Sequence, residues 1–176
     1  MASREARFNG HSYFSGGSIV WDVQSVDKLS AIREIVYRSQ AFQRIPGLDP
    51  ARFAEVVIER EKKGSTGFGH GVAIAHGRAP EVTTSQIVLG VSRQGINYSA
   101  IDGEPVQLLF IVANNPTQEM DYLRILSALV SLVRDPAFRQ ELLDCLSATD
   151  LESKLCSAFT ALMNGTKHRA AFARGA

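Results

Sequence analysis

The chain has 176 residues, of which 45% are hydrophobic and 21% charged, proportions typical of a globular protein with one well-buried core. Its formal net charge is +1, so composition gives no reason to expect bulk binding to nucleic acid or to a membrane surface. No stretch approaches the ~18 consecutive apolar residues of a membrane-spanning helix, and no apolar run follows Arg4 and Arg7 as it would in a secretory signal. We therefore expect a cytoplasmic protein without a membrane span.

Cys145 and Cys156 both fall in apolar helical patterns near the C-terminus. Cysteines in such patterns are more often buried small hydrophobes than disulfide partners or reactive thiols. The chain has no Cys-x-x-Cys motif and no larger cysteine framework, which fits a reducing compartment.

The first third of the chain predicts an arm followed by two helices. Residues 1–18 are polar and contain several glycines, which predicts a flexible N-terminal arm, and residues 19–23 form a short β-prone run. A helix with one apolar face follows a capping residue at Ser25 or Asp27. A second helix begins at Asp49-Pro50, where a capping acid precedes proline at the first helical position.

Three β-prone runs occupy residues 72–75, 86–91 and 107–113. The third run is nearly all apolar, which predicts a central strand buried on both faces. Asp102-Gly103 lies between the second and third runs, and Asp-Gly is a hairpin signal.

The last third predicts three helices. The first is long and amphipathic, and its spacing predicts an inward face made of Tyr122, Leu123, Leu126, Leu129, Val130 and Val133. Asp135-Pro136 starts a short helix. Thr149 and Glu152 form a capping box for the last helix, which ends near Met163.

The order of these elements predicts a single α/β layered domain, with a mixed β-sheet flanked by helices. We expect this domain to span residues 19–163. It would lie between the flexible N-terminal arm of residues 1–18 and a flexible basic tail of residues 164–176.

Residues 64–78 carry the densest group of chemically capable side chains. A glycine-rich loop with two hydroxyl groups, residues 64–71, runs into a short apolar strand that ends in His76-Gly77-Arg78. Glycines let the backbone approach a ligand closely. An imidazole beside a guanidinium group suits phosphate chemistry. We take this stretch as the candidate site.

The pattern argues against a nucleotide site and a metal site. The loop lacks the Gly-Lys-Ser/Thr of a Walker A motif, and it follows a helix and precedes a strand, the reverse of the order in such phosphate loops. His70 and His76 are six residues apart with no carboxylate obviously placed as a third ligand, while His11 and His168 lie in the expected arm and tail.

Two interpretations of His76 remain from the residues alone. It is either a core or edge histidine beside an ordinary turn, or a nucleophile that accepts a phosphoryl group. The second role needs an exposed neutral ring nitrogen with hydrogen-bonding or positive groups around the phosphoryl oxygens. The candidates for those groups are Arg60, Ser65, Thr66, His70 and backbone N–H groups.

The stretch 59–78 reads EREKKGSTGFGHGVAIAHGR. It resembles a motif of the enzyme IIA domains of the bacterial phosphotransferase system, in the fructose, mannitol and nitrogen-regulatory class. That motif reads roughly RE-x-x-x-STGIG-[NH]-G-[VI]-A-[IL]-P-H. Looser similarity extends from about Ile19 to Met163 and includes residues 100–106, before the central strand.

The resemblance implies that His76 accepts a phosphoryl group from a phosphohistidine of HPr or of its nitrogen-branch paralogue. His76 would pass the group to an enzyme IIB domain or keep it as a regulatory mark, and Arg60 would stabilise the phosphoryl charge. The other implied pocket residues are Ser65, Thr66, Gly67, Gly69, His70 and Arg78. No nucleotide, metal or other cofactor is implied, because the donor is already a high-energy phosphohistidine.

Two positions depart from the family's pattern. Ala75 stands where a proline usually precedes the histidine, which frees φ and restores an N–H donor. Tyr122 stands where a second histidine usually begins the long helix and lies against the first. A phenol donates one hydrogen bond but carries no positive charge, so His70 becomes the candidate for a second imidazole if the loop folds toward His76.

Two functions from different classes fit these residues. The first is a phosphoryl carrier with His76 as acceptor, of the nitrogen-regulatory branch or, alternatively, a fructose- or mannitol-type transport component. The second is a regulatory interaction module with an enzyme IIA fold, in which phosphorylation is weak. Tyr122 in place of histidine is the observation that motivates the second function.

Overall fold

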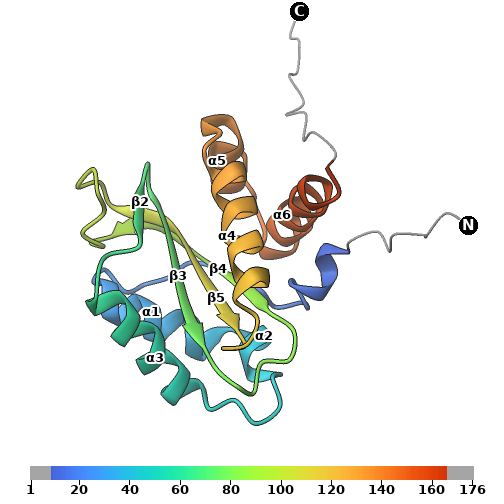
Figure 1. Ribbon diagram of the computed structural model, residues 1–176. Coiled ribbons are helices and arrows are strands. Elements are labelled where there is room, and N and C mark those ends of the chain that lie inside the picture. The colour runs from blue at the N-terminus through green and yellow to red at the C-terminus, as the bar shows by residue number, and fades with distance from the viewer. Residues whose placement is uncertain (1–8, 166–176) are drawn as a thin grey trace, which may run out of the picture.

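The computed structural model describes residues 9–165, which form a five-stranded sheet with helices on both faces (Figure 1). The strands are β1 (Ile19–Val20), β2 (Gly67–Gly69), β3 (Val72–Arg78), β4 (Gln86–Ile96) and β5 (Val106–Asn114). The helices are η1, a short 3₁₀ turn (Gly10–Ser12), α1 (Lys28–Arg38), α2 (Gln40–Gln43), α3 (Pro50–Lys62), α4 (Glu119–Val133), α5 (Pro136–Leu143) and α6 (Ala148–Met163). Among these residues, no helix combines the length and apolar character needed to cross a bilayer.

The sheet is mixed, with the strand order β1-β4-β5-β3-β2. Strand β5 lies at its centre, parallel to β3 and antiparallel to β4. At the two edges, β1 is parallel to β4 and β2 is antiparallel to β3. The predicted α/β class with a central, buried strand at residues 107–113 is confirmed.

Strand β3 is packed between two helical layers. Helices α1–α3 cover one face of the sheet and α4–α6 cover the other (Figure 1). Val72 and Ile74 belong to the core on the α4 side, whereas Ala73 and Ala75 belong to the core on the α3 side. Because side chains alternate between the faces of a strand, His76 lies on the α4 side.

Most of the predicted helix starts are confirmed. The side chains of Asp27, Asp49 and Asp135 accept hydrogen bonds from backbone N–H groups of the first turns of α1, α3 and α5. The predicted capping box of the last helix is wrong, because Ser147 caps α6 and accepts from the N–H of Asp150. The carboxylate of Glu152 instead accepts a hydrogen bond from the backbone N–H of Ser18, at 2.9 Å.

The buried face of α4 is rotated from the prediction. Tyr122, Leu129 and Val133 are buried as expected, but Leu123 is 47% exposed. The observed buried residues are Tyr122, Ile125, Ala128, Leu129, Leu132 and Val133. Apolar residues lie almost all around this helix, so their spacing alone leaves the inward direction undetermined.

The N-terminal segment from residue 10 is part of the packed domain rather than a free arm. Tyr13 and Phe14 are buried, and both rings pack edge-on against Phe159 of α6, with centroids 6.0 and 5.5 Å away. The backbone of Tyr13 accepts from Ile87 of β4, and its phenol donates to the carboxylate of Asp121 on α4. The rest of the predicted arm, residues 1–8, and the tail beyond residue 165 lie outside the described residues.

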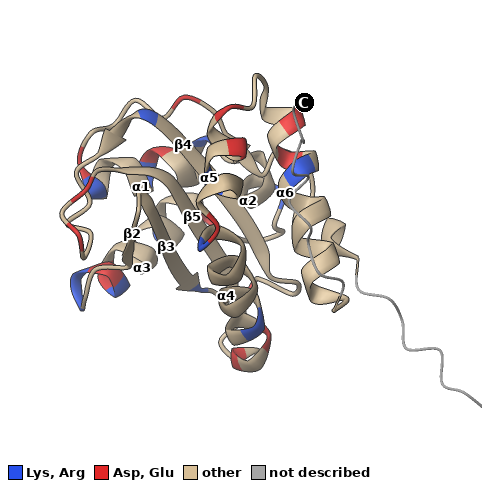
Figure 2. Ribbon diagram, turned by 90° about the horizontal axis from the view of Figure 1, so that it is seen from above, with Lys and Arg blue, Asp and Glu red and all other residues tan. Residues whose placement is uncertain are grey.

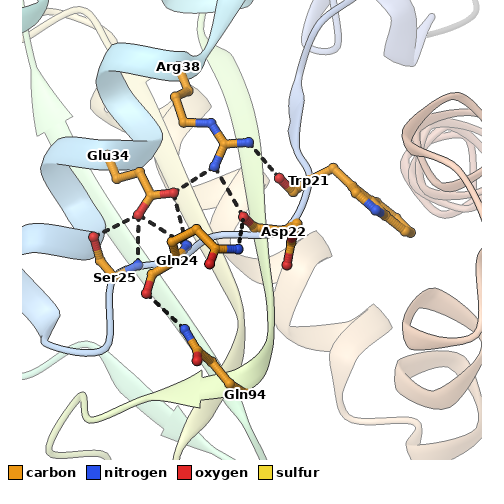
Figure 3. A network of polar contacts seen from close by, with 7 residues as sticks. All are labelled: Trp21, Asp22, Gln24, Ser25, Glu34, Arg38 and Gln94. Carbon is orange, nitrogen blue, oxygen red and sulfur yellow. Dashed lines mark hydrogen bonds and ion pairs between the residues drawn. The ribbon is translucent and has the colours of Figure 1, made fainter.

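The connection between β1 and α1 is held by one carboxylate (Figure 3). Glu34 accepts hydrogen bonds from the backbone of Gln24 and from the backbone and hydroxyl of Ser25. Arg38 pairs with Glu34 at 2.6 Å and also donates to the carbonyl of Asp22. Burial raises the pKa of Glu34, but these hydrogen bonds outweigh it and hold the pKa below its usual value. Ser25, proposed as a helix cap, therefore fixes this loop, while Asp27 caps the helix.

Replacement of Tyr13 by phenylalanine removes only the phenol oxygen that donates to Asp121. We expect the free energy of unfolding to fall by about 1–2 kcal/mol, because a hydrogen bond to a partly buried carboxylate is lost. Urea denaturation measures this. Tyr37→Phe is the matched control, since Tyr37 is 45% exposed on α1 and should be neutral. Equal free energies of unfolding for Tyr13→Phe and Tyr37→Phe would contradict a stabilising hydrogen bond between Tyr13 and Asp121.

Candidate functional site

His76 contacts Tyr122 across the interface between β3 and α4. The Tyr122 Oη atom lies 3.0 Å from Nδ1 of His76, and the two ring centroids are 4.5 Å apart at an interplanar angle of 37°. Tyr122 is 8% exposed and His76 is half-buried. The two candidate residues, 46 positions apart in the sequence, are thus brought into direct contact through Nδ1, which leaves Nε2 free of this contact.

His76 is neutral at neutral pH. Burial of the ring, followed by the nearby guanidinium groups of Arg60 and Arg78, lowers the pKa of His76 from 6.5 to about 4, against a smaller opposing effect of Glu61. Burial raises the pKa of Tyr122, against the same two arginines, so the phenol keeps its proton. The site therefore holds two neutral rings beside fixed positive charges.

A groove of about 590 Å³ opens beside His76, between the outer flank of α3 and the end of β3. His76, Gly77 and Arg78 supply the strand side of the groove, and Arg60 lies on the helix side. Arg60 is held in the last turn of α3, where its guanidinium group donates to the carbonyl of Gly64 at 3.2 Å. The structure thus brings together His76, Arg60, Arg78 and Tyr122 of the predicted site.

The family model for "Phosphoenolpyruvate-dependent sugar phosphotransferase system, EIIA 2" matches residues 12–155. The chain belongs to this family. The fructose-specific EIIABC component of Bacillus subtilis is 30% identical over 130 residues, which cover 74% of this chain but only 20% of that protein. This chain therefore spans about a fifth of the length of that relative.

Two solved structures show the same fold. The nitrogen regulatory protein IIA-Ntr of Neisseria meningitidis is 31% identical, with a TM-score of 0.72 over 79% of this chain and 93% of that chain. The mannitol enzyme IIA of Escherichia coli, in a complex with phosphorylated enzyme IIB, is 16% identical, with a TM-score of 0.62 over 83% and 96% of the two chains. The predicted membership of the enzyme IIA family, in the class that includes fructose, mannitol and nitrogen-regulatory members, is confirmed.

The loop hydroxyls of this enzyme IIA domain are used to hold the loop. Thr66 donates its backbone N–H and its hydroxyl to the carboxylate of Glu61, at 2.8 and 2.6 Å. The hydroxyl of Ser65 donates to the carbonyl of Tyr98 at 3.3 Å. Neither residue lines the groove beside His76. This arrangement therefore does not support the predicted role of Ser65 and Thr66 as walls of the phosphoryl pocket.

Glu61 is the residue that sequence reasoning missed. It is only 2% exposed, and it pairs with Lys28 of α1 at 3.4 Å while accepting both hydrogen bonds of Thr66. The ammonium group of Lys28 also lies over the ring of Tyr98, 5.2 Å from its centroid. One signal was available in the sequence, because Glu61 falls at helical spacing after the buried Val57 and Ile58.

His70 does not approach His76. It occupies the turn between β2 and β3 with a φ of +56°, is exposed, and its N–H donates to Asp102 at 2.7 Å. The turn precedes Val72, and the four residue steps from Val72 to His76 span roughly 13 Å of extended strand. The expectation that His70 supplies a second imidazole is therefore wrong.

The glycines serve packing rather than the histidine. At Gly67, an added Cβ would lie 2.5 Å from the backbone of Ala100, so β2 can approach the loop after β4 only without a side chain. Gly69 adopts a φ of +94° to form the turn. At Gly77, an added Cβ would lie 2.7 and 2.8 Å from Phe53 and Val57, so this glycine lets α3 pack directly on β3.

The other sequence candidates form no second site. Among residues 9–165, no three His, Cys, Asp or Glu side chains converge as a metal site would require. Cys145 and Cys156 are both buried free thiols, as predicted, and Sγ of Cys156 lies 3.6 Å from Nδ1 of His11. Burial raises the pKa of both thiols, which disfavours the reactive thiolate. His168 lies outside the described residues.

NMR titration of the His76 ring should give a midpoint near pH 4, because burial and two arginines oppose protonation. Arg60→Gln should raise the midpoint toward 6.5, whereas Arg33→Gln, on α1 and paired with Glu55, should leave it unchanged. Between pH 6.5 and 4 the unfolded chain takes up a proton at His76 that the folded protein does not. This residue therefore lowers the free energy of unfolding as the pH falls through that range. A wild-type midpoint of 6.5 would contradict this account.

Replacement of Glu61 by glutamine keeps the shape of the side chain but removes the charge that Lys28 and Thr66 share. We expect the free energy of unfolding to fall by about 2–4 kcal/mol, because a buried ion pair is broken. Denaturant unfolding measures the change. Glu59→Gln, two residues away and in an exposed pair with Lys62, should be neutral. Similar losses in both variants would rule out the structural role of Glu61.

Proposed function

We propose that this enzyme IIA domain is a phosphoryl carrier, in which His76 accepts the phosphoryl group from a phosphohistidine of an HPr-type protein. The observation that carries the proposal is the neutral, half-buried imidazole of His76 at the wall of a groove, beside Arg60 and Arg78. A neutral imidazole offers a nitrogen lone pair, and guanidinium groups match the charge and geometry of phosphoryl oxygens.

Tyr122 defines which nitrogen attacks. With the imidazole proton on Nδ1, His76 donates to the phenol oxygen 3.0 Å away and keeps its lone pair on Nε2. With the opposite tautomer, the phenol donates to Nδ1 and the proton on Nε2 blocks attack. Phosphoryl acceptance therefore uses the first tautomer. In-line transfer forms the N–P bond at Nε2 while the donor's N–P bond breaks and returns its electron pair to the donor nitrogen.

Arg60 and Arg78 compensate for the negative charge of the incoming phosphoryl group. A phosphoryl group adds about −1.5 to −2 charge near neutral pH. Arg60 comes from the last turn of α3, and Arg78 from the end of β3, where it also lies 3.4 Å from the exposed carboxylate of Glu119. An exposed pair of this kind is worth little, so Arg78 can turn from Glu119 to the phosphoryl group.

The family comparisons support the choice of branch and partners. Similarity to the IIA-Ntr protein of Neisseria supports the nitrogen-regulatory branch, with an HPr-type donor and either a regulatory protein or a IIB domain as the receiving partner. The mannitol enzyme IIA bound to phosphorylated enzyme IIB supports the second kind of partner. We assign the protein to the cytoplasm, where such a relay operates.

A second candidate function is a regulatory module that works by binding and is phosphorylated weakly. Tyr122 favours it, because this phenol is buried against His76 and carries no positive charge that could assist the transfer. Partner binding would then be indifferent to the loss of His76.

Incubation with phosphoenolpyruvate, enzyme I and an HPr-type donor, followed by ³¹P NMR, tests the carrier. His76→Ala should abolish phosphorylation, and His70→Ala, the matched control in the exposed turn, should retain it. Tyr122→Phe should slow the transfer about tenfold or more, because the acceptor that fixes the Nδ1 proton is lost. Tyr122→His tests whether a second imidazole speeds the transfer.

Failure of the wild-type protein to gain phosphate from any cognate donor pair would overturn the carrier function. If a partner then binds wild type and His76→Ala equally, the regulatory module is the better description. Phosphate retained in His76→Ala would place the acceptor at another residue.

A further inference from the structure

Beside His76, the sheet has an open edge. Strand β2 pairs with β3 only at Val72 and Ala73, and the last contact from that side is the hydrogen bond from the Ile74 N–H to the Thr66 carbonyl. On the other side of β3, the Ala79 N–H donates to Asn114 at the end of β5. Figure 1 shows β2 beside only the first part of β3.

The alternating direction of backbone N–H and C=O groups along a strand determines which of them face this open edge. In a strand, successive residues direct their N–H and C=O groups to opposite neighbours. Since Ile74 bonds toward β2 and Ala79 toward β5, the backbone N–H and C=O groups of His76 and Arg78 point to the open edge. A row of such groups is a template for another extended chain.

The groove along this edge is lined by two basic side chains that form no ion pair in the described part of the chain. These are Arg52 on α3 and Lys63 directly after it, which are both exposed and form no ion pair among residues 9–165. The two glutamates in the lining are already paired, Glu55 with Arg33 at 2.9 Å and Glu59 with Lys62 at 2.7 Å. Figure 2 shows basic and acidic positions side by side at one end of α3.

We propose that an extended acidic segment of a partner protein docks in this groove, pairs its backbone with the β3 edge at His76 and Arg78, and places carboxylates on Arg52 and Lys63. This inference goes beyond the phosphoryl-carrier proposal, because docking needs no phosphoryl transfer. Addition of a strand to a free sheet edge is a general mode of peptide recognition, in which backbone bonds give affinity and side chains give specificity.

The helix sets the spacing of the acidic residues. Lys63 follows the last residue of α3 and comes eleven residues after Arg52, which is roughly 16 Å along the helix axis. Side chains four positions apart lie on the same face of an extended strand, roughly 13 Å apart along it, and the long side chains of Arg52 and Lys63 span the remaining few ångströms. The segment therefore carries acidic residues at positions i and i+4, with β-prone residues between them.

The probe is a synthetic seven-residue peptide, Thr-Glu-Val-Thr-Val-Glu-Thr, blocked at both ends and titrated into the ¹⁵N-labelled full chain. We expect the amide signals of His76 and Arg78 to shift most. Lys63→Gln should weaken binding at least threefold, while Lys154→Gln, on α6 and paired with Glu141 away from the groove, should change it less than twofold. Raising the salt from 50 to 300 mM should weaken binding, because exposed charges are screened.

Two modified peptides separate the two parts of the proposal. The peptide with both glutamates changed to glutamine should bind at least fivefold more weakly, which tests the charge. The peptide with N-methyl groups on alternate backbone nitrogens should lose the shifts at His76 and Arg78, which tests strand pairing. Unchanged binding of the N-methylated peptide would overturn edge pairing.

Other outcomes also overturn the proposal. Equal effects of Lys154→Gln and Lys63→Gln would reduce the interaction to non-specific attraction, and a concentration-dependent dimer that excludes the peptide would make a second copy the occupant. Equal competition by inorganic phosphate at the same concentration would make the groove a simple anion site. Because the titration uses unphosphorylated protein, its failure leaves the test of His76 phosphorylation independent.

Discussion

The close approach of α3 to β3 is the constraint on which the site depends. Gly77 has no side chain, and a Cβ there would collide with Phe53 and Val57 of the helix, so the strand and helix can touch only at a glycine. This contact places the last turn of α3 beside the strand that carries His76. Arg60 and Glu61, consecutive residues of that turn, then act on opposite sides of the loop. Arg60 faces the groove, whereas Glu61 is buried beneath Thr66.

The arrangement separates the groups that hold the site from those that line it. Glu61, Lys28 and Thr66 form a buried network that fixes the glycine-rich loop. Tyr122 lies on the opposite face of the sheet, in the core under α4, and the half-buried His76 contacts it there. The loop motif that is most conspicuous in the sequence therefore works mainly as a structural support. The chemistry that we propose takes place at the other end of β3, where strand, helix and groove meet.

Local sequence patterns predicted the helices, the strands and the candidate histidine. The features that they did not predict depend on contacts between residues far apart in the sequence. Caps at Asp27 and Asp49 were predictable because a capping bond spans two or three residues. The direction of His70 was not, because it depends on a turn with positive φ pinned by Asp102, 32 residues away. Burial of Tyr13 likewise depends on helices that form more than 100 residues later.

Tyr122 changes how the charge of the site responds to pH. A second histidine would titrate near neutral pH, so part of the positive charge around His76 would vary with conditions. Here the neighbour is a phenol that burial keeps protonated, and the positive charge comes from Arg60 and Arg78. Guanidinium groups stay charged throughout the physiological range. The potential around His76 is therefore nearly constant over that range, and under the carrier function that we propose the arrival or loss of a phosphoryl group is the event that changes it.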